Sequence, residues 1–417
     1  MTGTALSGTA ADAGVASANP GQAVTLSGSG LSTSTGVILA YTNSNGTAQT
    51  VLLRPSAAAA DGTSATLIVP LYANGVATLS VLGAATRPRL QIVPLLTSYN
   101  VSGSTLQLFG AGLVEGASSY TLGGATVSDT AVNAGPDVFS ASNPTLNQFA
   151  DNVAVNISGA PFGLGTATVI TAGGTSAPLA FNVFNPAVST LGDVAADPAT
   201  GSVWVSDFNN PAKLDLVNPS TGQVASSITL TSAFGSTGLF NLAGLQVLSA
   251  AISLGGTPAP SGSLLVFNGN ASPDRVVAVN PSTGAVVASL ALANNYDLAA
   301  GTYDPTSGHL FVVDRRTSPT KVVEINPATA AEISSFALPF NASSYAGLVV
   351  DPAGGTLWYG SDQSGAAVQL SRTGAVLRTV SLTAQGVPAN TTSGLSFDAA
   401  GNLLVASNQG QVFRVKV

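Results

Sequence analysis

The sequence contains no cysteine, and it has only one histidine and one methionine in 417 residues. Without cysteine, the chain has neither a disulfide framework nor a zinc site with thiolate ligands. The single histidine, His309, excludes a catalytic metal centre that needs a pair of imidazoles. Any chemistry of this chain must therefore use carboxylates, hydroxyls, amides or its few basic side chains.

Charge is also scarce. Only 7% of the residues are charged, against roughly a quarter in typical soluble domains. The 12 basic residues form no run that would follow a phosphate backbone, and the net charge is −7, so we expect no nucleic-acid partner. No run of 18 apolar residues occurs, so we expect no membrane insertion. The surface must instead be covered by Ser, Thr, Asn, Gly and Ala.

The residues that are abundant favour strands. Val, Thr, Ser, Gly and Asn are frequent, whereas Glu, Lys, Arg and Gln, which stabilise helices, are rare. Short strands separated by many turns are therefore expected, and the predicted fold class is all-β.

The second half of the chain repeats two phrases. DPATGSVWVSD (197–207), DPTSGHLFVVD (304–314), DPAGGTLWYGSD (351–362) and DAAGNLLVAS (398–407) form the first series. NPSTGQVASSITL (218–230), NPSTGAVVASLAL (280–292) and NPATAAEISSFAL (326–338) belong to the second. Asp304, Asp351 and Asp398 are 47 residues apart, which is the period of a four-stranded propeller blade. We count five units, starting near 191, 242, 297, 345 and 393, and the second carries an insertion at 249–263.

The repeats also provide an internal control for His309. The same turn position is Ser202, Thr356 and Asn402 in the sister units. Because any small polar residue serves there, His309 is interpreted as a solvated residue at the start of a strand, and it does not by itself indicate an enzyme.

Two family resemblances follow from these motifs. The alternation of the two phrases over 187–417 resembles bacterial β-propellers of the YVTN and NHL type. In the first half, NPGQAVTLSGSGLS (19–32) and SGSTLQLFGAGLVEG (102–116) each begin a segment that is similar to the immunoglobulin-like IPT/TIG modules of bacterial surface proteins. The resemblances imply an N-terminal arm (1–16), two immunoglobulin-like β-sandwiches (17–94 and 95–186) and a β-propeller of about five four-stranded blades (187–417).

One segment fits both kinds of domain. PLAFNVF (178–184) can be the last strand of the second sandwich, or it can be the outer strand that the last propeller unit lacks, because that unit stops at QVFRVKV. If the sandwich keeps this segment, the propeller either closes without an outer strand in its last blade, or another chain or the N-terminal segment supplies that strand.

Two sets of residues are candidate sites. Asp207, Asp314 and Asp362 recur after the second strand of three units, where they can hold calcium at the channel mouth or accept hydrogen bonds from backbone amides of the next loop. Arg315, Arg316 and Lys321 form the most charged loop, which is either solvated or in contact with an anionic sugar, a lipopolysaccharide or a neighbouring subunit. No other cofactor is expected.

The sequence thus predicts a non-enzymatic, extracellular cell-surface protein: a structural subunit of a fibre or layer, or an adhesin with a propeller head. Self-association or contact with another surface protein is expected, and a glycan is a further candidate partner. Polymers would form if the arm (2–18) were lent to a neighbouring subunit. The alternatives are a propeller lyase or lactonase with a divalent metal in the central channel, and a carbohydrate-binding module that uses the 249–263 insertion.

Overall fold

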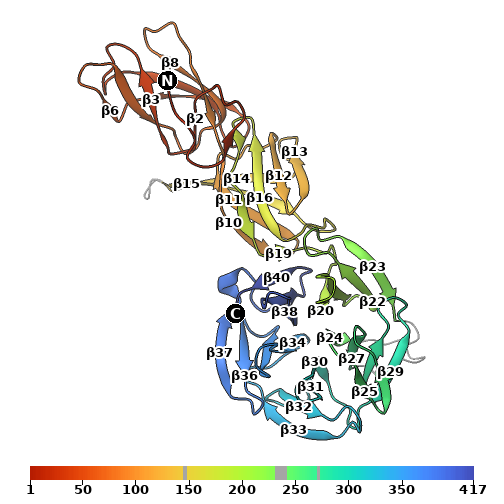
Figure 1. The fold of residues 1–417 in the computed structure, drawn as a ribbon. Coiled ribbons are helices and arrows are strands. Elements are labelled where there is room, and N and C mark those ends of the chain that lie inside the picture. The colour runs from red at the N-terminus through yellow and green to blue at the C-terminus, as the bar shows by residue number, and fades with distance from the viewer. Residues whose placement is uncertain (144–147, 231–241, 270–272) are drawn as a thin grey trace. The chain divides into compact units, whose positions relative to one another are not determined.

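The computed structural model describes residues 1–143, 148–230, 242–269 and 273–417. In these residues nearly all regular structure is β-strand, with one short 3-10 helix at Thr383–Gln385, so the all-β prediction is confirmed. No helix in these ranges is long and apolar enough to cross a membrane. The chain divides into two compact units, one comprising Met1–Ile157 with Gly165–Phe181 and the other Ser158–Leu164 with Asn182–Val417 (Figure 1).

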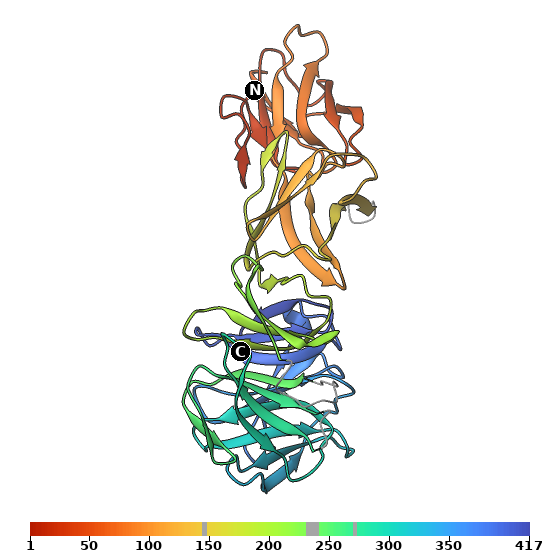
Figure 2. The same cartoon turned by 90° about the vertical axis from the view of Figure 1, so that its right-hand side faces the viewer.

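The first unit begins with a sandwich of two sheets, whose strands are seen from a second side in Figure 2. One sheet has the order β2-β9-β8-β4-β5 and the other the order β3-β7-β6. The strands are β2 (Ser17–Ala18), β3 (Ala23–Ser27), β4 (Val37–Thr42), β5 (Ala48–Leu53), β6 (Ala57–Ala58), β7 (Ser64–Ile68), β8 (Asn74–Val81) and β9 (Arg89–Ile92). Burial alternates along β3, which places Val24 and Leu26 in a core shared with Leu39 and Leu79.

A second sandwich completes this unit. Its sheets have the orders β10-β11-β15-β14 and β1-β17-β16-β12-β13, and β18 also pairs with β16. The strands are β1 (Thr9–Ala10), β10 (Leu95–Ser102), β11 (Thr105–Ala111), β12 (Ser118–Leu122), β13 (Ala125–Asp129), β14 (Asp137–Asn143), β15 (Gln148–Asn156), β16 (Gly165–Thr171), β17 (Gly174–Thr175) and β18 (Leu179–Phe181). Leu108 of one sheet and Tyr120 of the other are both fully buried. That the two sandwiches are immunoglobulin-like stays a prediction.

The N-terminal arm is bound to its own chain. Thr2 bridges to Thr25, β1 pairs with β17, and β2 pairs in parallel with β9. The buried Gln91 side chain accepts a hydrogen bond from the Asp12 backbone N–H at 2.7 Å and donates to the Asp12 carbonyl at 2.6 Å. The strand-forming tendency of the arm is therefore satisfied within the chain.

The second unit is a β-propeller of five four-stranded antiparallel sheets (Figure 1). Four blades have consecutive strands apart from an insertion: β20 (Leu191–Ala196), β21 (Val203–Asp207), β22 (Asn210–Val217) and β23 (Val224–Thr229); β24 (Leu242–Val247), β27 (Leu264–Asn268), β28 (Arg275–Val279) and β29 (Val286–Ala291); β30 (Leu298–Asp304), β31 (His309–Asp314), β32 (Lys321–Ile325) and β33 (Glu332–Ala337); β34 (Ala346–Val350), β35 (Leu357–Ser361), β36 (Ala366–Leu370) and β37 (Val376–Ser381). The fifth combines β38 (Thr392–Phe397), β39 (Leu403–Ser407), β40 (Val412–Val415) and β19 (Val183–Phe184). Each inner strand contacts the next, and β38 contacts β20, so the ring is closed.

The repeated phrases form turns that are stabilised by hydrogen bonds from their own backbone to Asp or Asn side chains. Asp197 and Asp351 accept from the backbone N–H two residues on, each at 2.9 Å, and Asn218 and Asn280 do the same in the second series. This is the Asx-turn geometry that Asp and Asn favour. The repeats thus specify where each strand pair reverses direction.

The segment 178–184 is divided between the two units. Leu179–Phe181 pairs with β16 of the second sandwich, whereas Val183 and Phe184 pair with Phe413 and Val412 of the last blade. Between them, the Asn182 side chain donates to the Arg414 carbonyl at 2.9 Å. The two interpretations of this segment are therefore each correct for part of it.

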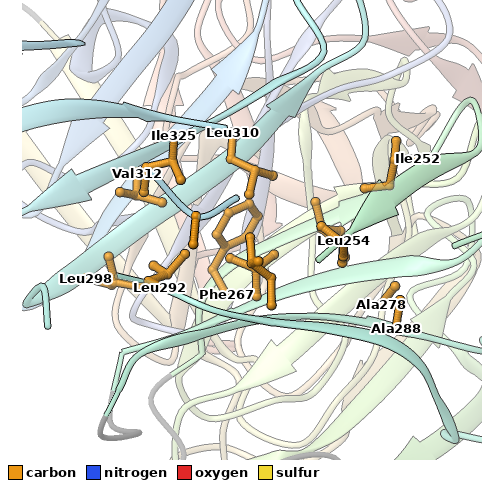
Figure 3. Packing of buried hydrophobic residues seen from close by; sticks show 14 of the residues in the cluster. Ile252, Leu254, Phe267, Ala278, Ala288, Leu292, Leu298, Leu310, Val312 and Ile325 are labelled. Atoms are coloured by element: carbon orange, nitrogen blue, oxygen red, sulfur yellow. The ribbon is translucent and has the colours of Figure 1, made fainter. Parts of the chain in front are cut away.

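The insertion at 249–263 forms a hairpin, β25 (Ile252–Leu254) and β26 (Thr257–Ala259), which contacts β29. Ile252 and Leu254 are buried in a core cluster with Ala278 and Ala288 (Figure 3). The Gly255 N–H also donates to the Pro327 carbonyl in the next blade at 2.9 Å. This hairpin covers core between two blades, which leaves little of its apolar surface for a carbohydrate.

Candidate functional site

The propeller axis contains one carboxylate that the repeat analysis missed. At corresponding ladder positions of the inner strands, the other blades have Gly244, Ala300, Gly347 and Gly394. The first blade has Asp193, whose oxygens accept from the N–H of Val194 at 2.8 Å and of Leu245 at 2.6 Å. The N–H of Leu395 also bonds to this carboxyl. Asp193 therefore ties the first blade to both of its neighbours.

Asp193 is 4% exposed, and its role is structural because its carboxyl binds backbone N–H groups of three blades. Burial raises the pKa of Asp193 well above its ordinary value, although the backbone hydrogen bonds act to lower it. A Cβ on Gly394 would lie 2.0 Å from an Asp193 oxygen, so glycine is needed opposite the carboxyl. Aligning the inner strands LGDVA, LAGLQ and TSGLS would have revealed this aspartate in the sequence.

One end of the propeller carries the loops between second and third strands and the connections between blades, and we call this end the loop face. Here Phe208, from the β21–β22 loop, packs edge-on against Tyr345, which precedes β34, with ring centroids 4.9 Å apart. The two residues belong to blades that are not neighbours in the ring. This contact, which we call the aromatic bridge, therefore crosses the loop face, and Phe208 remains 41% exposed.

Two of the predicted calcium ligands hold the loops of the aromatic bridge. Asp207 accepts from the Asn209 N–H at 2.9 Å. Asp362 accepts from the backbone N–H of Ser343 at 2.8 Å and of Tyr345 at 3.2 Å. The third, Asp314, accepts from the N–H of Arg316 at 3.1 Å. All three bind backbone amides, which is the alternative role considered for them.

The structure does not bring these three carboxylates together. They lie in three blades, and Ser361 rather than Asp362 occupies the ladder position that corresponds to Asp207 and Asp314. Across the ranges that the structure describes, no group of three or more His, Cys, Asp or Glu side chains is placed to hold a metal ion. A calcium ring of these residues therefore has no geometric support.

In the predicted basic loop, both arginines form ion pairs with aspartates of the same blade. Arg315 is 15% exposed, bonds Asp297 at 2.5 Å and donates to the Ser343 carbonyl. Arg316 is 47% exposed; its Nε lies 3.3 Å from Asp314 and its guanidinium lies over the Tyr296 ring at 5.3 Å. Lys321 begins β32 and is half-buried. Of the three, Arg316 is the best placed to meet a partner, and its charge is already opposed by a carboxylate.

Asp274, which the sequence did not single out, has the most unusual carboxyl of the loop face. It is 1% exposed, and one oxygen accepts from the Tyr296 N–H at 2.5 Å. The other has no hydrogen-bond partner among the described residues. Burial raises the pKa of Asp274 to about 7, while the Tyr296 N–H and the Arg316 charge oppose this shift. A carboxyl that titrates near neutrality can act in acid–base chemistry.

His309 lies at the opposite end of its blade from the loop face, at the start of β31. Its Nδ1 is 2.7 Å from Glu324, whose other oxygen accepts from the Ser334 hydroxyl at 2.6 Å. The hydroxyl bonds the carboxylate rather than the imidazole, so these three residues do not form a nucleophilic triad. The His309 side chain is thus 30% exposed and paired with a carboxylate. That it has no catalytic role stays a prediction.

No family model and no curated protein matches the sequence. Among solved structures, the chain is similar to a calcium-binding protein, regucalcin, from Agrobacterium tumefaciens, with 15% identity and a TM-score of 0.37 over 55% of this chain and 90% of that one. The chain is 12% identical to streptogramin B lyase, with a TM-score of 0.34 over 76% of this chain and 96% of that one. It is also 12% identical to a protein of unknown function from Bacteroides thetaiotaomicron, with a TM-score of 0.36 over 95% of each chain. At these values the likenesses assign no activity to this chain.

Proposed function

We propose that this chain is a non-enzymatic, extracellular surface protein whose propeller binds a partner on the loop face, with two immunoglobulin-like sandwiches as a spacer. The aromatic bridge of Phe208 and Tyr345 is the observation that carries this proposal. It places an exposed aromatic side chain on a face where the loops are fixed by Asp207 and Asp362.

The physical argument is pre-organisation. Aromatic side chains bury a large area with few rotatable bonds, and they dominate the binding energy of many interfaces. A loop that is already held by hydrogen bonds loses little further entropy when a partner binds. The Asp362 carboxylate holds three consecutive backbone amides, from Ser343 to Tyr345, which fixes one side of the bridge.

The bound N-terminal arm favours an adhesin over a polymer built by strand donation. Its strands already pair with β9 and β17 of the same chain. Lending the arm to a neighbour would first break these contacts and the hydrogen bonds of Gln91. The partner in this proposal is either another surface molecule or a second copy of this chain that binds without exchanging the arm.

The test compares retention of the labelled full chain on the cell-envelope fraction of the organism that encodes it. We expect Phe208→Ala to reduce retention at least tenfold, because it removes the exposed half of the aromatic bridge. Ile333→Ala is the matched control, since Ile333 is 47% exposed on the outer strand β33, away from the loop face. Equal retention of all three proteins, or none of the wild type, would refute a binding role for the bridge.

A propeller lyase or lactonase is the second candidate, and the pKa of about 7 at Asp274 favours it. Its test is turnover of a panel of γ- and δ-lactones, with and without calcium. Turnover that Asp274→Asn abolishes would replace the binding proposal, whereas turnover by neither protein would remove this candidate.

A further inference from the structure

The first sandwich carries a groove that none of the sequence motifs indicated. Two hollows of about 430 and 390 Å³ adjoin on β4, β5 and the turn between them, and β8 and Ser140 of β14 in the second sandwich complete their lining. They share Tyr41 and Gln49, so they form one continuous surface, which we call the tyrosine groove. Both hollows are open to solvent rather than enclosed.

The walls of the tyrosine groove are uncharged. Neither hollow is lined by an Asp, Glu, Lys, Arg or His among the described residues. Tyr41 and Tyr72 lie with ring centroids 5.6 Å apart and planes tilted by 49°, and Tyr72 is 36% exposed. Around the rings lie amides and hydroxyls, contributed by Asn43, Asn45, Gln49, Thr42, Thr50 and Thr78.

Below the groove, a buried polar network holds two of the lining hydroxyls in place. Ser44 and Ser140 each donate to the same Asp151 oxygen at 2.8 Å. The Asn74 side chain donates to the Ser44 hydroxyl at 3.2 Å. Asp151 and Asn74 are fully buried, and the backbone N–H groups of Gly112 and Leu113 also bond to the Asp151 carboxylate.

This network determines what the hydroxyls offer to a ligand. Because both serine protons point to Asp151, Ser140 is left to accept hydrogen bonds from the groove. The amides of Asn43, Asn45 and Gln49 can both donate and accept. The groove therefore offers one fixed acceptor, adaptable amides and two aromatic rings, of which Tyr72 is the more exposed, but no net charge.

We infer that the tyrosine groove binds a neutral oligosaccharide. Sugar rings have an apolar C–H face that packs on aromatic rings, and their hydroxyls both donate and accept, which matches this lining. An anionic sugar would find no cation here, and an apolar ligand would leave the amides unpaired. The inference is independent of the propeller, since all of its residues lie in the first unit.

The experiment is isothermal titration calorimetry of the full chain with cellohexaose, maltohexaose, mannohexaose and penta-N-acetylchitopentaose. We expect millimolar or tighter binding of at least one of them, unchanged between 50 and 500 mM NaCl, because no ion pair is involved. Tyr72→Ala should weaken this binding at least tenfold, and Gln49→Ala should weaken it several-fold.

Two control variants separate the groove from general effects on the protein. Gln223→Ala removes an exposed amide in the propeller, and Leu82→Ala removes a 65% exposed side chain of the first sandwich outside the groove. Both should bind like the wild type. Circular dichroism checks that each variant is folded, and Gln49→Ala keeps the test decisive if Tyr72→Ala does not fold.

The inference is overturned if no neutral oligosaccharide binds at 10 mM, or if binding survives both groove variants. It is equally overturned if an oligogalacturonate binds more tightly than every neutral probe. None of these results bears on retention through Phe208, so failure here and failure of the proposed function are distinguishable.

Discussion

At the scale of single residues, the propeller axis depends on a match between one large polar side chain and the glycine opposite it. Asp193 accepts backbone hydrogen bonds from three blades, and Gly394 leaves the room that its carboxyl needs. An unpaired carboxyl at this depth would be strongly destabilising. The hydrogen bonds and the glycine together make the buried aspartate tolerable.

Replacing Gly394 with alanine should destabilise the protein by more than about 3 kcal/mol, because the new Cβ would lie 2.0 Å from an Asp193 oxygen and 2.7 Å from its Cα. Gly354→Ala is the control, since a Cβ there meets nothing within 4 Å and should change stability by no more than about 0.5 kcal/mol. The measurement is urea unfolding followed by circular dichroism. Equal midpoints for the two variants would contradict the packing described at the axis.

Asp274 predicts a pH dependence of a definite sign. Burial raises the pKa of Asp274 to about 7 in the folded protein, against about 3.9 in an unfolded chain. Folding is thus favoured by protonation, so this residue adds stability as pH falls from 8 to 5 and its contribution is lost as pH rises through 7. The difference is on the order of 2–4 kcal/mol.

Asp274→Asn should remove this contribution, so its unfolding free energy should rise less than that of the wild type between pH 8 and pH 5. Denaturant titrations at four pH values measure this difference, and the other titrating groups cancel in the comparison. Parallel curves for the two proteins would show that Asp274 does not titrate in this range.

At the scale of elements, the insertion of the second blade packs its apolar residues onto the core, whereas Ser253, Thr257 and Pro258 stay exposed. Leu254 of the hairpin is fully buried with Ala278 and Ala288, and Gly255 bonds Pro327 of the next blade. A long loop in a propeller suggests function, but here its apolar residues cover core that would otherwise be exposed.

Leu254→Ala should therefore destabilise the protein by about 2–5 kcal/mol, as expected for truncation of a fully buried leucine. Leu82→Ala, at a 65% exposed position, should have a small effect and serves as the control. Thermal unfolding followed by calorimetry compares them. A Leu254→Ala protein as stable as the control would return the hairpin to the list of candidate binding loops.

At the scale of the whole molecule, the propeller is closed by a strand that comes from far away in the sequence. Val183 and Phe184 pair with the last strand of the chain, and Phe184 is fully buried in a cluster with Leu191 and Val412. The distant segment completes the fourth strand of the last blade, so this blade forms only when residues from the two ends of the propeller sequence come together.

Phe184→Ala should therefore destabilise the ring by about 3–5 kcal/mol, and amide exchange should accelerate in the first and fifth blades. Ile333→Ala, on an outer strand within one blade, should leave exchange unchanged there. Hydrogen exchange with mass spectrometry measures both variants. Faster exchange spread evenly over all blades, or in none, would argue against closure at this point.

The sequence alone determined the all-β class and the five propeller units, because these depend on residues close together in the chain. Turn aspartates and asparagines such as Asp351 and Asn280 hold their own loops, and strand-forming residues lie between them at a fixed period. The period also led us to interpret His309 as an ordinary turn residue, since its sister turns replace it, and this interpretation stays a prediction.

Only the tertiary structure decided which distant residues meet. The division of 178–184 between two units, the aromatic bridge and the tyrosine groove all join segments far apart in sequence. The backbone amides that surround Asp362 and the burial of Asp274 likewise depend on the folded ring. A local sequence pattern specifies turns and strands. The contacts made when a ring closes or two sheets pack join residues far apart in the sequence, so a local pattern does not predict them.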